Sequence, residues 1–137
     1  MHRPCKVLVV EDDRFVSQLL GDLLEAEGFE FRLADNGAEK MRAALACEPD
    51  IDIVVLDVAL PGPANGLKLA NEARARGYAV ILVTGDHRRA DELAKSGHPH
   101  LMKPFRMAAL LQLIDRVLTE TRNECRRPSP EVRVARV

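Results

Sequence analysis

The stretch Asp52-Ile53-Val54-Val55-Leu56-Asp57 decides the fold of this chain. An apolar run of this kind, bounded by polar residues, is typical of a parallel strand that helices cover on both faces. A second run, residues 5–10, has the same character and ends directly before Glu11 and Asp12. The sequence therefore predicts two central strands, each followed by carboxylates.

Strands and helices are predicted to alternate along the chain. The expected strands are 5–10, 30–34, 52–57, 79–84 and 100–102, and the expected helices are 14–27, 38–47, 66–76, 87–96 and 106–121. Strict alternation indicates a parallel sheet with right-handed crossovers. Five units are too few for the usual closed barrel. The predicted fold class is α/β: a flavodoxin-like, open, doubly wound five-stranded parallel sheet with strand order 2-1-3-4-5 and helices on both faces.

Two of the predicted helices differ in how much apolar surface they can bury. The helix at 14–27 has apolar residues recurring at helical spacing, namely Phe15, Val16, Leu19, Leu20, Leu23 and Leu24. The helix at 87–96 offers only Ala90, Leu93 and Ala94. Because little apolar area gives little stabilisation, we expect helix 87–96 to be among the least firmly docked elements and a candidate moving part.

Length and composition predict one domain of residues 1–121 and a flexible Arg- and Pro-rich tail at 122–137. A net charge of -1 gives no general attraction to nucleic acid or to an acidic membrane surface. No apolar run is long enough for a membrane span and no leader is evident, so a cytoplasmic location is expected. Cys5 and Cys47 belong to no Cys-x-x-Cys pair and are expected to be small buried residues.

Five polar groups follow the predicted strands. They are Glu11, Asp12, Asp57, Thr84 and Lys103. The carboxyl ends of parallel strands meet at one edge of an open sheet, which is where the chemistry of such folds gathers. Carboxylates held close together repel one another, so folding alone explains the cluster poorly. The combination suits a divalent cation and a phosphoryl group.

Four motifs in this order resemble the receiver domain of two-component response regulators. They are Val7-Leu8-Val9-Val10-Glu11-Asp12-Asp13, Val55-Leu56-Asp57 with Pro61-Gly62, Val83-Thr84-Gly85, and Lys103-Pro104-Phe105. Each motif alone is weak, but together they are specific. The resemblance covers residues 5 to about 121.

The resemblance implies a phosphoryl acceptor. Asp57 would receive the phosphoryl group from the phosphohistidine of a sensor histidine kinase or a phosphotransfer protein. Lys103 and Thr84 would each contact a phosphoryl oxygen. The ligands of the implied Mg²⁺ are Asp12, Asp57, the main-chain carbonyl of Ala59 and waters, one of which Glu11 orients. A cis bond before Pro104 is also expected from the family.

The resemblance also implies a switch. Thr84 would move toward the phosphoryl group, and His100, at a position that is often aromatic in the family, would fill the space left behind. The surface formed by helix 87–96, the last strand and the final helix would then change. Its partner would be a downstream protein or a second copy of the chain, with no direct nucleic-acid contact and no membrane. A histidine there could make the switch depend on pH.

Other interpretations remain open. Asp12 or Asp13 could cap the helix at 14–27, Asp57 could be a turn residue, and Lys103-Pro104 could be an ordinary turn. A magnesium-dependent phosphohydrolase would use a second aspartate where Ala59 stands, so the chain is not expected to be an enzyme beyond phosphorylating and dephosphorylating itself. It is expected to be a stand-alone receiver that works as a phosphorelay intermediate or by binding a partner protein. The alternatives are one module of a longer hybrid kinase or regulator, and a binding module that ignores phosphorylation.

Overall fold

A computed structural model of the chain describes residues 3–34, 37–59 and 66–120. The strands are β1 (Lys6–Val10), β2 (Glu30–Ala34), β3 (Ile53–Asp57), β4 (Ala79–Thr84) and β5 (His100–Met102). The helices are α1 (Arg14–Ala26), α2 (Ala38–Cys47), α3 (Gly66–Ala75), the short 3-10 helix η1 (His87–Arg89), α4 (Ala90–Ser96) and α5 (Met107–Glu120). These bounds agree closely with the predicted ones. The exception is the helix at 87–96, whose first turn is the separate element η1.

The five strands form one parallel sheet in the order β2-β1-β3-β4-β5, so the predicted fold class is confirmed. The register fixes which strand ends lie level with one another. Val10 of β1 pairs with Leu56 of β3, so Glu11 and Asp57, the next residues, come at the same level. Thr84 pairs with Met102, which places Lys103 just beyond Thr84 at the same edge.

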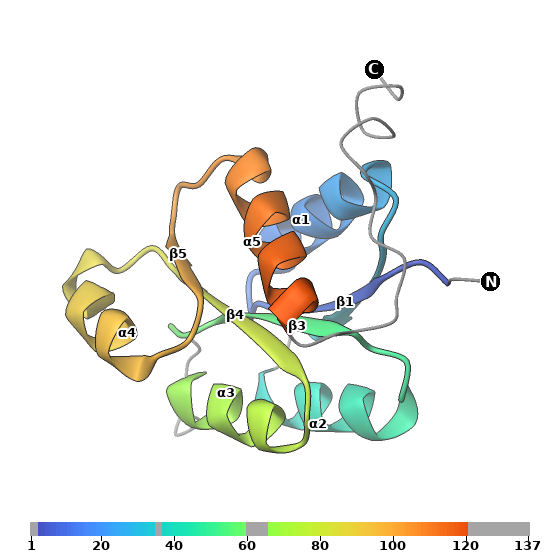
Figure 1. The fold of residues 1–137 in the computed structure, drawn as a ribbon, viewed down its shortest axis with the longest axis horizontal. Helices are drawn as coiled ribbons and strands as arrows, with labels where there is room; N and C mark the ends of the chain where they lie inside the picture. Colours follow the sequence, from blue (N-terminus) through green and yellow to red (C-terminus); the bar gives the residue numbers. More distant parts are fainter. Residues whose placement is uncertain (1–2, 35–36, 60–65, 121–137) are drawn as a thin grey trace.

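Helices cover both faces of the sheet (Figure 1). Alternate side chains of each central strand point to opposite faces, so the strands contribute to two separate cores. One core lies under α1 and α5, and the other lies under α2, α3 and α4. Val9 and Val55 belong to the first core, and Leu8 and Leu56 belong to the second. Burial on both faces explains why these strands are almost entirely apolar.

Helix α1 buries less of its apolar surface than its sequence suggests. Leu24 is fully buried, and Leu20 packs against the core, but Phe15 is 79% exposed, Leu19 51% and Leu23 43%. Apolar residues at six positions spread over an arc wider than the contact that one helix makes with a sheet. The excess positions form an apolar surface on the outside of the fold.

Helix α4 is held by little apolar contact, as predicted. Leu93 is its one buried side chain, whereas α5 buries six. Burial of one leucine contributes about 2 kcal/mol, so other contacts have to supply much of what holds α4 in place.

The remaining predictions have mixed outcomes. The bond between Lys103 and Pro104 is cis, as expected. Cys5 is buried, but Cys47 is exposed at the end of α2, so the prediction for Cys47 is wrong. Within the ranges described above, no helix is long and apolar enough to cross a membrane. The predicted tail at 122–137 lies outside those ranges.

Candidate functional site

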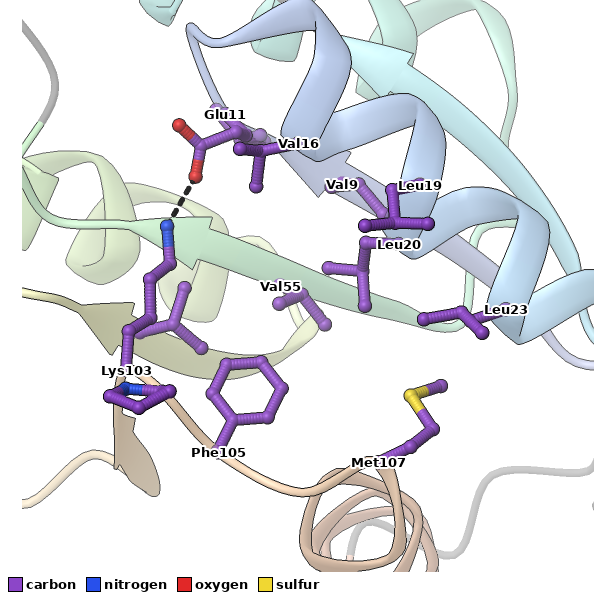
Figure 2. A pocket seen from close by; sticks show the side chains of 13 residues that line it. Val9, Glu11, Val16, Leu19, Leu20, Leu23, Val55, Lys103, Phe105 and Met107 are labelled. Carbon is purple, nitrogen blue, oxygen red and sulfur yellow. Dashed lines mark hydrogen bonds and ion pairs between the residues drawn. The ribbon is translucent and has the colours of Figure 1, made fainter.

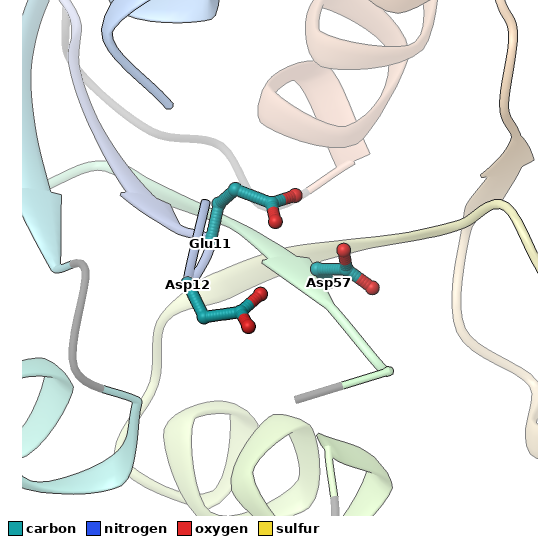
Figure 3. A group of neighbouring side chains, drawn as sticks. All are labelled: Glu11, Asp12 and Asp57. Atoms are coloured by element: carbon teal, nitrogen blue, oxygen red, sulfur yellow. The ribbon is translucent and has the colours of Figure 1, made fainter. Parts of the chain in front are cut away.

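Three carboxylates meet where β1 and β3 end. One carboxylate oxygen from each of Glu11, Asp12 and Asp57 lies within 4.8 Å of the others, and Figure 3 shows the side chains gathered in this way. Glu11 and Asp57 are buried, while Asp12 is exposed. Hard oxygen ligands at this separation suit Mg²⁺, which binds through few carboxylates and keeps several waters.

Lys103 crosses to this cluster from the loop after β5. Its Nζ donates to Glu11 Oε2 at 2.6 Å and to Asp57 Oδ2 at 3.0 Å. The second oxygen of Asp57, Oδ1, accepts a hydrogen bond from the backbone N–H of Ala59 at 2.8 Å. The Asp57 carboxylate is therefore oriented from both sides.

The electrostatics of the cluster are unfavourable without a cation. Burial raises the pKa of Glu11 to about 7, helped by the neighbouring Asp57 and opposed by Lys103. Burial lowers the pKa of Lys103, but its hydrogen bonds to Glu11 and Asp57 outweigh that effect and leave the pKa above its usual value. A bound divalent cation would relieve the repulsion between the carboxylates, so the residues present fit Mg²⁺.

The structure separates the three consecutive acids at 11–13. Asp13 is the N-cap of α1, where its Oδ1 accepts from the backbone N–H groups of Phe15 and Val16 at 3.0 and 3.2 Å. Since Asp13 does the capping, Glu11 and Asp12 are left for the cluster. Of the two residues that could cap this helix, Asp12 and Asp13, it is therefore Asp13 that does so.

Thr84 lies at the carboxyl edge of the sheet, whereas His100 begins β5 and pairs with Leu82, two residues before Thr84. Thr84 is fully buried at the end of β4, and its Oγ1 accepts from the backbone N–H of Asp86 at 3.1 Å. His100 is half-buried, and its Nδ1 lies 3.0 Å from the carbonyl oxygen of His98. Ala59 is exposed, and its backbone N–H contacts the Asp57 carboxylate.

A groove adjoins the cluster between α1 and α5. Its volume is about 470 Å³, and Glu11 and Lys103 lie at one end of it (Figure 2). The rest of its lining is mainly apolar, including Val16, Leu19, Leu20, Leu23, Phe105 and Met107. The surplus of apolar positions on α1 was the signal for this groove in the sequence. The groove itself requires α5 beside α1, and the local pattern does not show that packing.

One contact near the site has no signal in the sequence. The Arg89 guanidinium donates from Nη1 to the carbonyl oxygen of Val58, the residue after Asp57, at 2.8 Å. The two residues are 31 positions apart in the chain. In the sequence, Arg89 is one of several basic residues in the segment 87–96, and nothing in the local pattern distinguishes it from the others.

Comparisons with known proteins identify the family of the chain. The profile of the family described as "Response regulator receiver domain" matches residues 7–115. The aerobic respiration control protein ArcA of Escherichia coli K12 is 33% identical over 121 residues, covering 85% of this chain and 50% of ArcA. The DNA-binding response regulator MtrA of Mycobacterium tuberculosis H37Rv is 29% identical, covering 96% of this chain and 57% of MtrA. The chain thus spans about half the length of these curated relatives.

Solved structures show the same architecture. A response regulator receiver domain protein from Clostridium thermocellum superimposes with a TM-score of 0.76 at 27% identity, covering 86% of this chain and 97% of that one. The response regulator TrrA from Thermotoga maritima, solved in complex with Mg²⁺ and BeF, gives a TM-score of 0.72 at 28% identity. That match covers 83% of this chain and 99% of TrrA.

Proposed function

The chain belongs to the response regulator receiver domain family, and from this membership we propose that it accepts a phosphoryl group on Asp57. The donor is the phosphohistidine of a sensor histidine kinase or of a phosphotransfer protein. An Asp57 oxygen attacks the phosphorus, the phosphorus–nitrogen bond to histidine breaks, and an acyl phosphate forms. The observation that carries the proposal is the Asp57 carboxylate, oriented by Lys103 and grouped with two further acids at the sheet edge.

The residues around Asp57 have separate roles in binding the cation and the phosphoryl group. Asp12, Asp57 and the carbonyl of Ala59 would hold Mg²⁺, with Glu11 orienting a bound water. When bound, Mg²⁺ neutralises charge between the carboxylate and the incoming phosphoryl group. Lys103 would exchange its contact with Asp57 for one with a phosphoryl oxygen. Thr84 would donate its hydroxyl to another phosphoryl oxygen.

Phosphorylation of Asp57 is transmitted to partners as a structural change at one face of the domain. Phosphorylation draws Thr84 inward, His100 follows, and the face formed by α4, β5 and α5 is altered. Its partner is a downstream protein or a second copy of the chain. The relatives weaken the expectation that nucleic acid plays no part, because MtrA is named as DNA-binding and this chain matches about half of it. The same module could therefore serve within a longer regulator.

The proposal is tested by incubating the protein with acetyl phosphate, with and without Mg²⁺, and measuring intact mass. A receiver gains one phosphoryl group only when Mg²⁺ is present. Continuous release of phosphate without stable addition would indicate a phosphohydrolase instead. No addition under any condition would favour a binding module that ignores phosphorylation and would contradict the proposal.

The groove beside the site is the proposed docking surface for the phosphoryl donor. A donor has to bring its histidine to Asp57, and the groove runs from Glu11 and Lys103 along exposed apolar residues of α1. An apolar helix face on the donor would bury this surface, as amphipathic helices do in grooves.

Replacement of Leu19 by glutamate is expected to slow phosphoryl transfer from a phosphotransfer protein about tenfold, because a buried interface would then contain an unpaired charge. Loading by acetyl phosphate is expected to be unchanged, because Leu19 does not touch Asp57. Transfer is measured with a phosphorylated phosphotransfer protein that reacts with the parent. Ala43→Glu, an exposed site on α2 across the sheet, is the matched control. Equal transfer to the Leu19→Glu variant and the control would rule the groove out as the donor surface.

A further inference from the structure

Arg89 connects the start of α4 to the phosphorylation site. Its Nη1 donates to the Val58 carbonyl oxygen at 2.8 Å, while Nε and Nη2 bind the two carboxylate oxygens of Glu92 at 3.1 and 3.2 Å. The side chain is only 24% exposed. Since Leu93 is the one buried residue of α4, the bond from Arg89 to Val58 is among the contacts that tie this helix to the rest of the fold.

The anchor for Arg89 is a fixed part of the backbone. Val58 is buried, and its N–H donates to the Val83 carbonyl of β4 at 3.0 Å. On another side Gly66 packs so closely that a Cβ there would lie 2.4 Å from the Val58 Cα. Because Val58 is held between β4 and α3, we expect a change in this contact to come from a movement of Arg89 and α4.

Phosphorylation creates a demand for one more positive charge beside Val58. The carboxylate of Asp57 carries one negative charge, whereas an acyl phosphate carries about two. When Glu11, Asp12 and Asp57 are all ionised, their three negative charges are balanced by the three positive charges of Lys103 and one Mg²⁺. Phosphorylation of Asp57 adds about one negative charge that these cations do not balance. Arg89 already contacts the residue next to Asp57. Its guanidinium also pairs with the singly charged carboxylate of Glu92, and a phosphoryl group of about two charges is a stronger acceptor than either present partner.

The neighbouring Arg88 does not share this position. Its side chain is 91% exposed, and its guanidinium binds Asp86, two residues away, at 3.0 and 3.2 Å. Arg88 and Arg89 therefore have the same charge on the same short helix, but only Arg89 contacts Val58. This pair gives a matched comparison inside the chain.

We propose that Arg89 ties α4 to Val58 in the unphosphorylated protein and moves its guanidinium to the phosphoryl group once Asp57 is modified. The movement breaks the Val58 contact and draws the first turn of α4 toward the site. This inference rests on the proposed phosphorylation of Asp57. It adds a second route, besides Thr84 and His100, by which the modification reaches α4.

The test compares Arg89→Gln with Arg88→Gln, using beryllofluoride with Mg²⁺ as the phosphoryl analogue. The Arg89→Gln variant is expected to bind the analogue about tenfold more weakly than the parent, because it lacks one charge-assisted contact. Arg88→Gln is expected to match the parent. Amide exchange in residues 87–96 is measured with and without the analogue. We expect the analogue to change it in the parent and in Arg88→Gln, and to change it far less in Arg89→Gln.

The outcomes separate this inference from the proposed function. Faster exchange in Arg89→Gln with an unchanged affinity for beryllofluoride would show a merely structural contact and overturn the inference alone. Arg89→Lys keeps the charge without the fork and is expected to recover part of the affinity. A parent that neither binds beryllofluoride nor takes up a phosphoryl group would overturn the proposed function and this inference with it.

Discussion

Replacement of Asp57 by asparagine is expected to abolish phosphoryl uptake. The amide nitrogen and oxygen of asparagine are far weaker nucleophiles than a carboxylate, and they cannot form an acyl phosphate. Glu11 also accepts from Lys103, but its pKa is raised to about 7, so part of it is protonated at neutral pH and a poor nucleophile. Intact mass after incubation with acetyl phosphate and Mg²⁺ is expected to show only the unmodified variant.

The loss should not come from unfolding. Asparagine has the shape of aspartate and can still accept from Ala59 through its oxygen. It loses the bond to Lys103 but no longer repels Glu11, so the free energy of unfolding is expected to change by about 1 kcal/mol or less. Asp22→Asn, an exposed site on α1, is the control and is expected to take up the phosphoryl group normally. Uptake by the Asp57→Asn variant at the parental rate would place the acceptor elsewhere.

Mg²⁺ affinity is expected to fall below neutral pH. The pKa of Glu11 lies at about 7 rather than at its ordinary 4.5, so below that pH the side chain is increasingly protonated. The charged form of Glu11 orients a water on the cation and adds negative charge, so the affinity is expected to decrease below pH 7 until it approaches that of a variant without this charge. Isothermal titration calorimetry between pH 5.5 and 8 measures this dependence.

Glu11→Gln is the informative variant for this prediction. Glutamine does not titrate, so its Mg²⁺ affinity is expected to be weaker at pH 8 and to vary much less between pH 7 and 5.5. The raised pKa of Glu11 also determines how the free energy of unfolding varies with pH. A pKa raised from 4.5 to about 7 means that the folded state binds the proton more tightly than the unfolded chain. Without metal, the free energy of unfolding should fall as pH rises through this interval, and that slope should disappear in Glu11→Gln. Identical pH profiles for parent and variant would show that Glu11 does not control binding.

Most of the fold could be predicted because the relevant signals are local. Runs such as Ile53–Leu56 are apolar since both faces of β3 are covered, and five strand–helix units leave few topologies. The grouping of Glu11, Asp12 and Asp57 followed from the rule that parallel strands end at one edge.

The parts that sequence could not supply depend on packing between elements. Three adjacent acids look alike in the chain, and only the start of α1 assigns Asp13 to capping. Helical periodicity marks Phe15 and Leu19 as apolar but does not say whether a neighbour covers them. The bond from Arg89 to Val58 joins residues far apart in the chain, so no local pattern reports it.

The placement of the helices has a consequence for the order of signalling events. Helices α1 and α5 lie on one face of the sheet (Figure 1). The groove is on this face, whereas Leu93 of α4 packs into the core on the other face. A donor bound over α1 would leave α4 uncovered. The groove also borders Phe105 and Met107, however, at the start of α5, which belongs to the proposed target face. A target that covers this end of α5 would therefore compete with the donor, whereas a target that contacts only α4 would not.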